Sequence, residues 1–302
     1  MIKIRPETIA DYAAIARVNA RAFDTHVKVA WLVSLHRHRT RFDPELSLVA
    51  EVDGRIVGHV LFSPQTIRLL GQDVEVVNLS PLAVDPDHQR QGVGSALVEE
   101  GHRIAKGKGY PLSFLVGHPP YYPRLGYLKR AYGGRYDGIS MRVTTADFAA
   151  GHLETRMPSE ADVPALRDLW RHEEGAVDFS IDPGDALLGW LSPNPAITTW
   201  VYTQAGEIVG YARVMGAKAL YFLARDGETA RQMSRQIGAE VELPLHPYSA
   251  STEGLGIPTI DGSDAAMVCP FAPSPFDDYY AQVQAGKRIP GRALWGVEFD
   301  IS

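Results

Sequence analysis

The sequence predicts an α/β (α+β) protein in which one fold occurs twice. The pattern Arg-x5-Asp-x3 followed by Ile or Leu begins at Arg5 and again at Arg156, and the pattern Gly-x-Ile-Val-Gly begins at Gly54 and, with Glu in the variable position, at Gly206. The offsets of 151 and 152 residues keep both patterns in register, which indicates a repeated structural unit. A segment near residues 79–97 changes from strand to helix and supports the mixed fold class.

The elements of each copy follow in the same order. Each copy begins with a strand and a helix that starts at an aspartate, Asp11 or Asp162, and then contains a hairpin whose turn is Asp53-Gly54 or Ala205-Gly206. Between the copies, Arg142–His152 shows little apolar periodicity and is interpreted as the linker. We therefore expect a first domain over residues 1–147 and a second over residues 153–302.

Composition narrows the class of protein. Of 302 residues, 45% are hydrophobic and 22% are charged, which is ordinary for a globular protein with room for two cores. No segment approaches the roughly 18 consecutive apolar residues of a membrane helix, and the chain does not start with a basic stretch and an apolar run, so we expect a cytoplasmic protein with no membrane partner. The single cysteine, Cys269, excludes an intramolecular disulfide, and its apolar neighbours favour a buried structural thiol. We expect no metal site.

Charge is distributed unevenly between the halves. Residues 1–150 contain 19 basic and 15 acidic side chains, whereas residues 151–302 contain 11 and 21. A positive half suits an anionic ligand and an acidic half attracts a cationic amine, although the same charges also serve solubility. The overall net charge of −6 and the pI near 5.9 disfavour a nucleic-acid partner.

The most informative stretch, residues 79–97, is interpreted as a strand, a turn and the start of a helix. Leu82–Val84 form an apolar strand end, Asp85–Asp87 break it, and Gly92 and Gly94 let the backbone approach a ligand closely. From Ser95 the pattern is helical. Free amides and the positive end of the helix dipole favour a pyrophosphate at such a helix start. The structural alternative is a plain strand-to-helix turn with two glycines.

Two common phosphate-binding loops do not fit this stretch. A dinucleotide-binding G-x-G-x-x-G would need Gly or Ala where Leu97 stands, and a P-loop would need Gly-Lys followed by Ser or Thr, which is absent. Downstream, Ser113–Gly117 is a short apolar run typical of a buried strand, and the segment His118–Tyr127, with the sequence HPPYYPRLGY, follows it.

Together these segments resemble the GNAT superfamily of N-acetyltransferases. The loop Gln89–Gly94 has the family spacing Q/R-x-x-G-x-G/A, and Tyr122–Tyr127 is similar to the family element Y-x-x-x-G-F/Y. The segment Leu46–Pro64 and the string around His118 resemble the YhbS-type group of predicted bacterial acetyltransferases. The resemblance covers about the first 145 residues, and two motifs in the family order are more specific than either alone.

The resemblance implies a fold, a co-substrate and a reaction. Each domain would be a mixed, mostly antiparallel twisted sheet flanked by helices. Acetyl-coenzyme A would give its acetyl group to a primary amine by direct attack in a ternary complex. The expected acceptor is a small molecule, and a protein N-terminus or lysine, or a longer acyl donor, is left open. Backbone amides of Leu82 to Val84 would hold the oxyanion. The expected coenzyme-binding residues are Leu82, Ala83, Val84, Gln89, Arg90, Gln91, Gly92, Val93, Gly94, Ser95 and Tyr122.

Two catalytic residues are expected from the same resemblance. Tyr122 is the expected general acid toward the leaving sulfur, because a phenol can match the basicity of a thiolate. Its alternative is a structural phenol packed against prolines, and Tyr121 next to it makes the assignment ambiguous by one residue. His118 is a candidate base, and its alternative is a hydrogen-bonded structural histidine.

The general base is otherwise unassigned. Many family members carry a glutamate on the strand before the loop, whereas residues 77–81 contain no carboxylate. Asn78 or Ser80 could hold a water that relays the proton, and Glu75 lies further back. A non-catalytic sensor that binds acyl-coenzyme A is therefore an alternative function.

The second copy lacks both motifs, so the resemblance to coenzyme-binding members stops at the linker. We expect a degenerate GNAT-like domain that shapes the acceptor pocket or makes an oligomer contact, and a homodimer or a dimerisation scaffold is left open. Phe23, His26 and Trp31 in the first helical region are candidates to line the acceptor pocket, or alternatively core residues.

Overall fold

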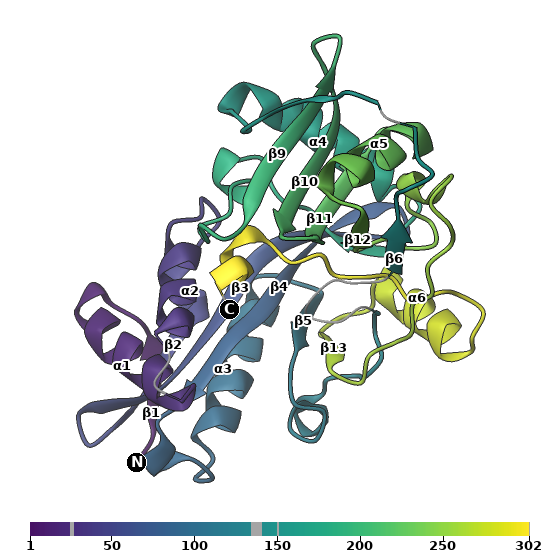
Figure 1. The fold of residues 1–302 in the computed structure, drawn as a ribbon. Helices are drawn as coiled ribbons and strands as arrows, with labels where there is room; N and C mark the ends of the chain where they lie inside the picture. Colours follow the sequence, from purple (N-terminus) through teal and green to yellow (C-terminus); the bar gives the residue numbers. More distant parts are fainter. Residues whose placement is uncertain (25–26, 134–140, 150, 302) are drawn as a thin grey trace.

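The computed structural model describes residues 1–24, 27–133, 141–149 and 151–301, and His26 lies outside them. Two sheets form the framework, and in Figure 1 the second sheet stands above the first. The predicted α/β class is confirmed, because helices flank both sheets and most strand pairs in each are antiparallel.

The first sheet has the strand order β1-β2-β3-β4-β5-β13, and β8 pairs with the far end of β3. Its one parallel pair is β4 with β5, which a helical crossover connects. The strands are β1 (Lys3–Pro6), β2 (Ser47–Val52), β3 (Arg55–Leu69), β4 (Gln72–Val84), β5 (Leu112–Val116), β8 (Phe179–Ile181) and β13 (Ala266–Pro270).

The second sheet has the order β6-β12-β11-β10-β9-β7, and its one parallel pair, β11 with β12, also spans a helical crossover. The two sheets therefore share a hairpin of long strands followed by a β-α-β unit. The strands are β6 (Met141–Thr144), β7 (Glu154–Arg156), β9 (Thr198–Gln204), β10 (Glu207–Met215), β11 (Lys218–Ala224) and β12 (Glu240–Leu243).

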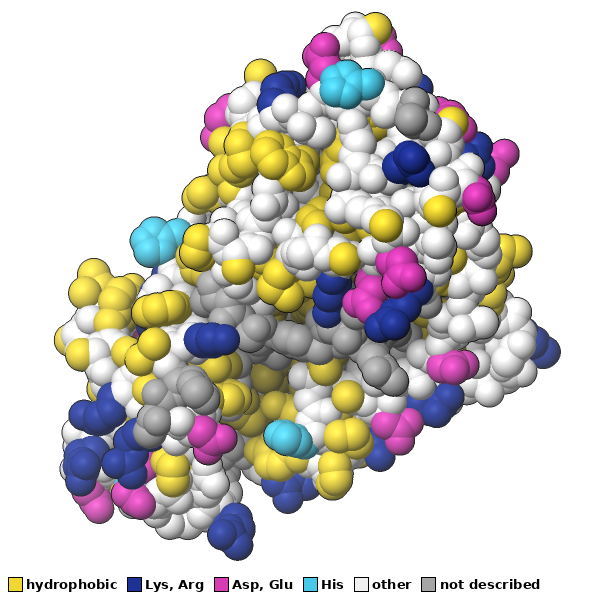
Figure 2. Space-filling view, viewed as in Figure 1, with side chains coloured by type: hydrophobic (Ala, Val, Ile, Leu, Met, Phe, Trp, Pro, Cys, Tyr) yellow, Lys and Arg dark blue, Asp and Glu magenta, His cyan; other side chains and the backbone are white. Residues whose placement is uncertain are grey.

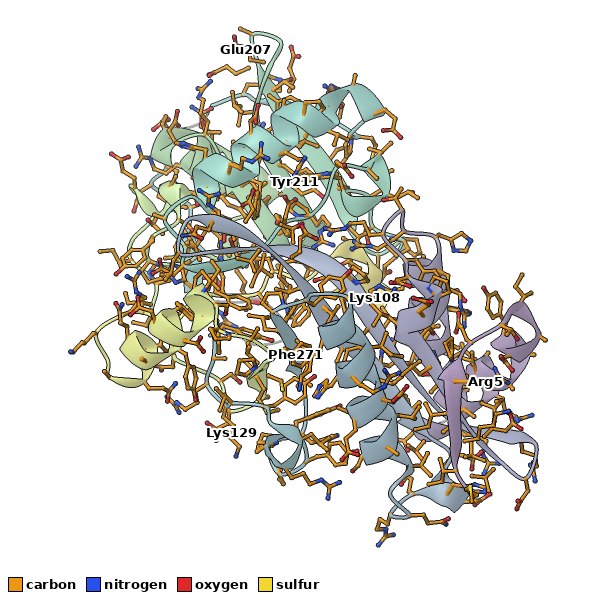
Figure 3. The ribbon with its side chains drawn as sticks, turned by 180° about the vertical axis from the view of Figure 1, so that it is seen from behind. Arg5, Lys108, Lys129, Glu207, Tyr211 and Phe271 are labelled. Carbon is orange, nitrogen blue, oxygen red and sulfur yellow. The ribbon has the colours of Figure 1, made fainter. Side chains whose placement is uncertain are left out.

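Helices cover both faces of the first sheet. The helix between β4 and β5 packs on one face, where Phe62 lies against Gly101 of that helix, and the first two helices cover the other face through Ile15, Val18 and Val33. Figure 3, seen from behind, shows the crossover helix along the sheet, with Lys108 just after its end. The helices are α1 (Tyr12–Ala22), α2 (Lys28–Arg37), α3 (Val93–Gly107), α4 (Val163–Glu173), α5 (Gly227–Ile237) and α6 (Pro275–Gln284).

The repeated Arg-x5-Asp pattern corresponds to a repeated set of contacts. Arg5 donates two hydrogen bonds to Asp11, at 2.7 and 2.9 Å, and Arg156 donates two to Asp162, at 2.6 and 2.7 Å. In both copies the same aspartate closes a capping box at the start of the first helical segment. The spacing is thus required because one carboxylate joins the first strand to the following helix.

Each half of the chain contributes a strand to the sheet of the other half, which the sequence did not predict. The interpretation of Arg142–His152 as a linker is wrong at its start, because Met141–Thr144 form β6 and pair with β12. Conversely β13, from the second half, pairs with β5 over five residue pairs. The expected boundary between residues 147 and 153 therefore does not separate the two sheets. β6 is only four residues long, too short to give a clear alternation.

One hydrophobic core belongs to both halves. Phe114 and Tyr132 of the first half pack with Phe179, Phe276 and Trp295 of the second. Cys269 is buried at the end of β13, as expected, and burial raises the pKa of its thiol to about 11. Among the described residues no helix is long and apolar enough to cross a membrane, and no group of three His, Cys, Asp or Glu side chains could hold a metal ion.

We expect Phe276→Ala to lower the free energy of unfolding by about 3–5 kcal/mol, because it leaves a cavity in the shared core. Denaturant unfolding followed by tryptophan fluorescence measures this cost. The loss should appear in a single transition, since Trp295 of the shared core should unfold together with Trp170 and Trp190, which pack in a core against the second sheet. Two separate transitions, of which one is unaffected, would contradict the shared core.

Candidate functional site

The start of α3 is an open helix terminus. Its N-cap is Gly92, whose φ of +85° is a left-handed conformation that glycine adopts without strain, and no side chain caps the helix. The first helical bond runs from the Ala96 amide to the Gly92 carbonyl, at 3.0 Å, so the amides of Val93, Gly94 and Ser95 have no helical acceptor. Such donors, together with the helix dipole, favour an anion at a helix start.

The parting of two strands opens the sheet beside this helix start. β4 and β5 pair only at Val77–Ser113 and Asn78–Phe114, although β4 continues to Val84. The Asp85 amide donates to the Val57 carbonyl of β3 at 2.8 Å. Because amides alternate along a strand, those of Val84 and Leu82 point toward the open edge. β4 therefore continues past its last pair with β5, and the amides of Leu82 and Val84 face the side where that pairing has ended.

A cleft of about 680 Å³ joins the open strand edge to the helix start. Figure 2 shows this face hollowed in its lower part, with hydrophobic side chains inside the hollow. The lining includes nine expected site residues, Leu82, Val84, Gln89, Arg90, Gly92, Gly94, Ser95, His118 and Tyr122. It also includes Ala22, Phe23, Tyr121 and Arg124.

Three expected coenzyme-binding side chains lie elsewhere. Ala83 points to the opposite face and packs with the α1 residues, because side chains alternate along β4. Val93 belongs to the core under α3, and the Gln91 side chain donates to the Asp87 carbonyl at 3.1 Å. Only the backbone of these residues remains available to a ligand in the cleft.

The two neighbouring tyrosines take different positions. Tyr122 is buried in the core of the first sheet, where burial raises the pKa of its phenol well above the ordinary value. A Cβ at Gly94 would lie 2.6 Å from the Tyr121 hydroxyl, so Tyr121 reaches the helix start. The Arg124 guanidinium stacks 4.3 Å from the Tyr121 ring centroid, which keeps a cation at the cleft.

The candidate bases lie in different places relative to the cleft. His118 is exposed at the rim of the cleft, where its carbonyl accepts the Tyr121 amide at 2.9 Å. Glu75 is exposed and forms an ion pair with Arg41 away from the cleft, so the structure does not support it as a base. Asn78 is fully buried, and neither polar atom of its side chain has a hydrogen-bond partner among the described residues.

Of the two expected acceptor residues that the structure describes, Phe23 lines the cleft and Trp31 does not. Trp31 is 58% exposed and faces a separate groove, with Leu35 of α2 and with Pro193 and Pro195 of the second half. The sequence did not suggest this groove, because the α2 residues that line it and Pro193 and Pro195 are more than 150 residues apart.

The matching helix start in the second half is closed. The Asp226 carboxylate caps α5 by accepting the Thr229 amide at 2.7 Å, and so takes a donor that an anionic ligand would need. The Glu253 carbonyl also lies against Gly227, at the first position of α5. The absence of the glycine loop from this copy thus coincides with a blocked site.

The sequence matches a family model described as an acetyltransferase (GNAT) domain over residues 3–129, which contain the open helix start and the cleft. Two curated relatives come from Escherichia coli strain K12, and both are described as uncharacterized N-acetyltransferases. YjhQ is 35% identical over 117 residues, 39% of this chain and 64% of the relative. YhbS is 33% identical over 127 residues, 41% of this chain and 72% of the relative. The chain thus spans less than two thirds of YjhQ.

A solved GCN5-related N-acetyltransferase from Kribbella flavida matches more of the length. It has a TM-score of 0.68 and 16% identity, and the match covers 89% of this chain and 71% of that one. At this identity the likeness concerns the fold alone. The match extends over most of the chain and so includes the second half. The chain belongs to the GNAT acetyltransferase family, on the evidence of the family model and the likeness to YhbS.

We expect Asp226→Ala to lower the free energy of unfolding by about 1 kcal/mol, because it removes the cap of α5. Denaturant unfolding measures the change, and Asp226→Asn should recover most of it because asparagine also caps helices. Equal stability of parent and Asp226→Ala would show that the carboxylate does not satisfy the helix start.

Proposed function

We propose that the protein is an N-acetyltransferase that moves the acetyl group of acetyl-coenzyme A to the primary amine of a small molecule. The observation that supports this most is the uncapped start of α3 at one end of a cleft whose other end is an unpaired strand edge. A pyrophosphate and a thioester need these two kinds of backbone donor.

In this proposal the pyrophosphate binds at Gly92–Ser95, and Arg90 and Arg124 supply positive charge beside it. The pantetheine arm follows the open edge of β4. The amides of Leu82 and Val84 hold the thioester oxygen as charge develops on it during attack by the amine. The backbone supplies these donors, so side chains at 82 to 84 need only leave the edge accessible.

The two neighbouring tyrosines have different roles in this proposal. Tyr122 gives its phenol proton to the departing sulfur, because it lines the cleft and is protonated when the thiolate begins to form, although burial also raises the cost of the phenolate that remains. Tyr121, whose hydroxyl lies at the helix start, contributes to phosphate binding instead. The second half binds no coenzyme, because its helix start is capped, and serves to complete the first sheet and the acceptor side.

A second candidate function is a sensor that binds acyl-coenzyme A without turnover. It is favoured by the lack of any carboxylate among the described residues that line the cleft, where a general base would be expected. Release of free thiol on addition of a panel of primary amines to the protein and acetyl-coenzyme A supports the enzyme, and binding without release supports the sensor.

Gly92→Asp should raise the dissociation constant for acetyl-coenzyme A at least about 100-fold, because a carboxylate would face the pyrophosphate and occupy its donors. Isothermal titration calorimetry measures this change. The matched control is Gly71→Asp, at another exposed glycine with a φ of +76° in the β3–β4 turn, which should bind as the parent does. Unchanged affinity in Gly92→Asp would overturn the assignment of the pyrophosphate site to Gly92–Ser95.

Tyr122→Phe should lower kcat by about 100-fold and leave the dissociation constant for acetyl-coenzyme A within a factor of about two, because it removes only a proton donor. Stopped assays of thiol release give kcat, and calorimetry gives the affinity. Tyr121→Phe should show the opposite pattern, with weaker binding and a smaller loss of kcat. Full activity of Tyr122→Phe would assign the acid role to another group.

A further inference from the structure

The coenzyme cleft differs in character between its two ends. Near the helix start at Gly92, the lining includes the cations Arg90 and Arg124. Beside the open strand edge, the lining is apolar and comes from the ends of β4 and α1: Leu82, Val84, Ala22 and Phe23. Under the proposed function the phosphates bind at the charged end, so the amine meets the thioester at the apolar end.

Two contacts fix the end of α1 beside this strand edge. Arg21, in the last turn of α1, pairs at 3.2 Å with Asp85, the residue directly after β4. Ala22 packs against the cluster that contains Ala83 of β4. The next residue, Phe23, lines the cleft and is 37% exposed, so its ring is available to a ligand. An acceptor at the strand edge therefore meets an aromatic wall.

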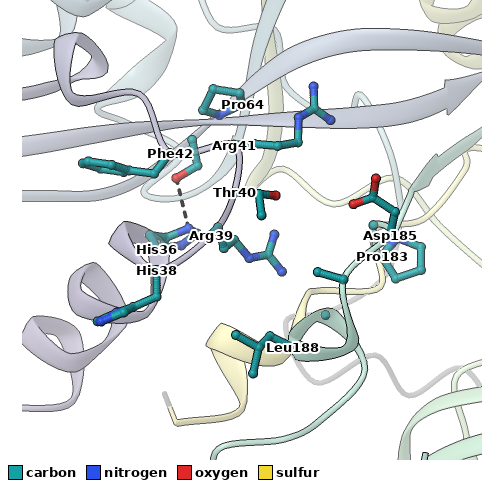
Figure 4. Close-up of a pocket in the computed structure, with 14 residues that line it drawn as sticks. His36, His38, Arg39, Thr40, Arg41, Phe42, Pro64, Pro183, Asp185 and Leu188 are labelled. Atoms are coloured by element: carbon teal, nitrogen blue, oxygen red, sulfur yellow. Dashed lines mark hydrogen bonds between the residues drawn. The ribbon is translucent and has the colours of Figure 1, made fainter. Parts of the chain in front are cut away.

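The described residues that line the cleft offer no carboxylate to a second cationic group on an acceptor, because none of them is Asp or Glu. Asp85 and Asp87, the acids that follow β4, are both paired with Arg21, at 3.2 and 2.9 Å. In the second half, Asp185 lines a separate cavity, where Figure 4 shows its side chain. An ion that leaves water without a partner is costly, so the apolar end disfavours a doubly charged acceptor.

We propose that the acceptor is an apolar primary monoamine, which binds against Phe23 as the uncharged amine. This inference rests on the proposed acetyltransferase function and names the substrate class of the same cleft. Apolar surroundings disfavour the ammonium form, because burial favours the neutral form of a base. The amine then reaches the thioester with its lone pair free, and the cleft needs no carboxylate to remove a proton from an ammonium group.

The transfer balances with the groups of this cleft. The acceptor releases its ammonium proton to water before it binds. The uncharged nitrogen then forms a bond to the carbonyl carbon, and the carbon–sulfur bond breaks. The departing sulfur takes the proton of Tyr122, which lines the cleft, and the proton that the nitrogen loses restores the Tyr122 hydroxyl. The products are an N-acetyl amine and coenzyme A.

The pH dependence distinguishes this mechanism from one with a base on the protein. The titratable and charged groups among the described residues of the cleft are Arg90, His118, Tyr121, Tyr122 and Arg124. Of these side-chain types, an imidazole ordinarily titrates near neutral pH, so His118 is the rival source of an acidic limb. A limb that moves with the acceptor indicates the uncharged amine, and a limb that belongs to His118 indicates an enzymatic base.

The first test compares matched acceptors with the full-length protein and acetyl-coenzyme A, by the release of free thiol. We expect kcat/KM for butylamine to exceed that for putrescine at least about 30-fold, because putrescine brings a second ammonium group to the apolar end. We expect phenethylamine to exceed phenylalanine by a similar factor, because phenylalanine adds a carboxylate to the same ring and amine.

The second test changes the acceptor preference at Phe23. Phe23→Asp should shift the ratio of kcat/KM for butylamine and putrescine at least about 100-fold toward putrescine, because its carboxylate pairs with the second ammonium group. The matched control is Leu188→Asp, at another exposed apolar residue, which lines the separate cavity of Figure 4 and should keep the parent's ratio. If Phe23→Asp fails to fold by circular dichroism, Phe23→Ser decides the matter by a selective loss of kcat/KM for phenethylamine.

The third test follows kcat/KM with pH for phenethylamine and for a fluorinated phenethylamine, whose ammonium group is more acidic. The acidic limb should lie at lower pH for the fluorinated amine, by the difference between the pKa values of the two ammonium groups. The limb should also remain in His118→Gln. A limb at the same pH for both amines, which disappears in His118→Gln, would overturn the binding of the uncharged amine.

The outcomes separate the two proposals. Equal kcat/KM for butylamine and putrescine, or an unchanged ratio in Phe23→Asp, overturns the substrate class while the acetyltransferase proposal stands. Calorimetric binding of acetyl-coenzyme A by the parent without thiol release, for monoamines, diamines and amino acids alike, overturns the transferase proposal and this inference with it.

Discussion

The structure depends on how strand β5 is held in the first sheet. β5 pairs with β4 at only two positions, because the strands part after Asn78, and this parting creates the cleft. Two ladder pairs alone would hold a strand weakly. The five residue pairs between β5 and β13 compensate on the other edge, and β13 comes from the second half of the chain. The open edge of β4 is thus possible because the second half supports its neighbour.

The two copies differ at the start of the helix that follows the long strand. Both copies place a helix directly after a long strand and return to a parallel strand beside it. At the helix start the first copy has Gly92 and no side-chain cap, whereas the second has Asp226, whose carboxylate accepts the Thr229 amide. The second carboxylate stabilises its helix by the interaction that a ligand would otherwise make. The fold is therefore repeated, whereas the uncapped helix start that we propose to bind the coenzyme is present in the first copy and not in the second.

Buried polarity marks the site as clearly as the motif does. Tyr122 and Asn78 both lie in an environment that disfavours charge, and the unpartnered Asn78 amide is costly in a core of leucine, isoleucine and phenylalanine. Such groups rarely persist in a core without partners.

The sequence by itself determined the features that depend on neighbouring residues. The cradle at Gly92–Ser95 and the repeated ion pairs follow from short spacings, because backbone conformation and capping are local. Only the tertiary structure decided the exchange of β6 and β13 and the contact between His36 and Ser63. Strand pairing across 150 residues, and the face on which a polar side chain lies, depend on ladder register and core packing, which no local pattern specifies.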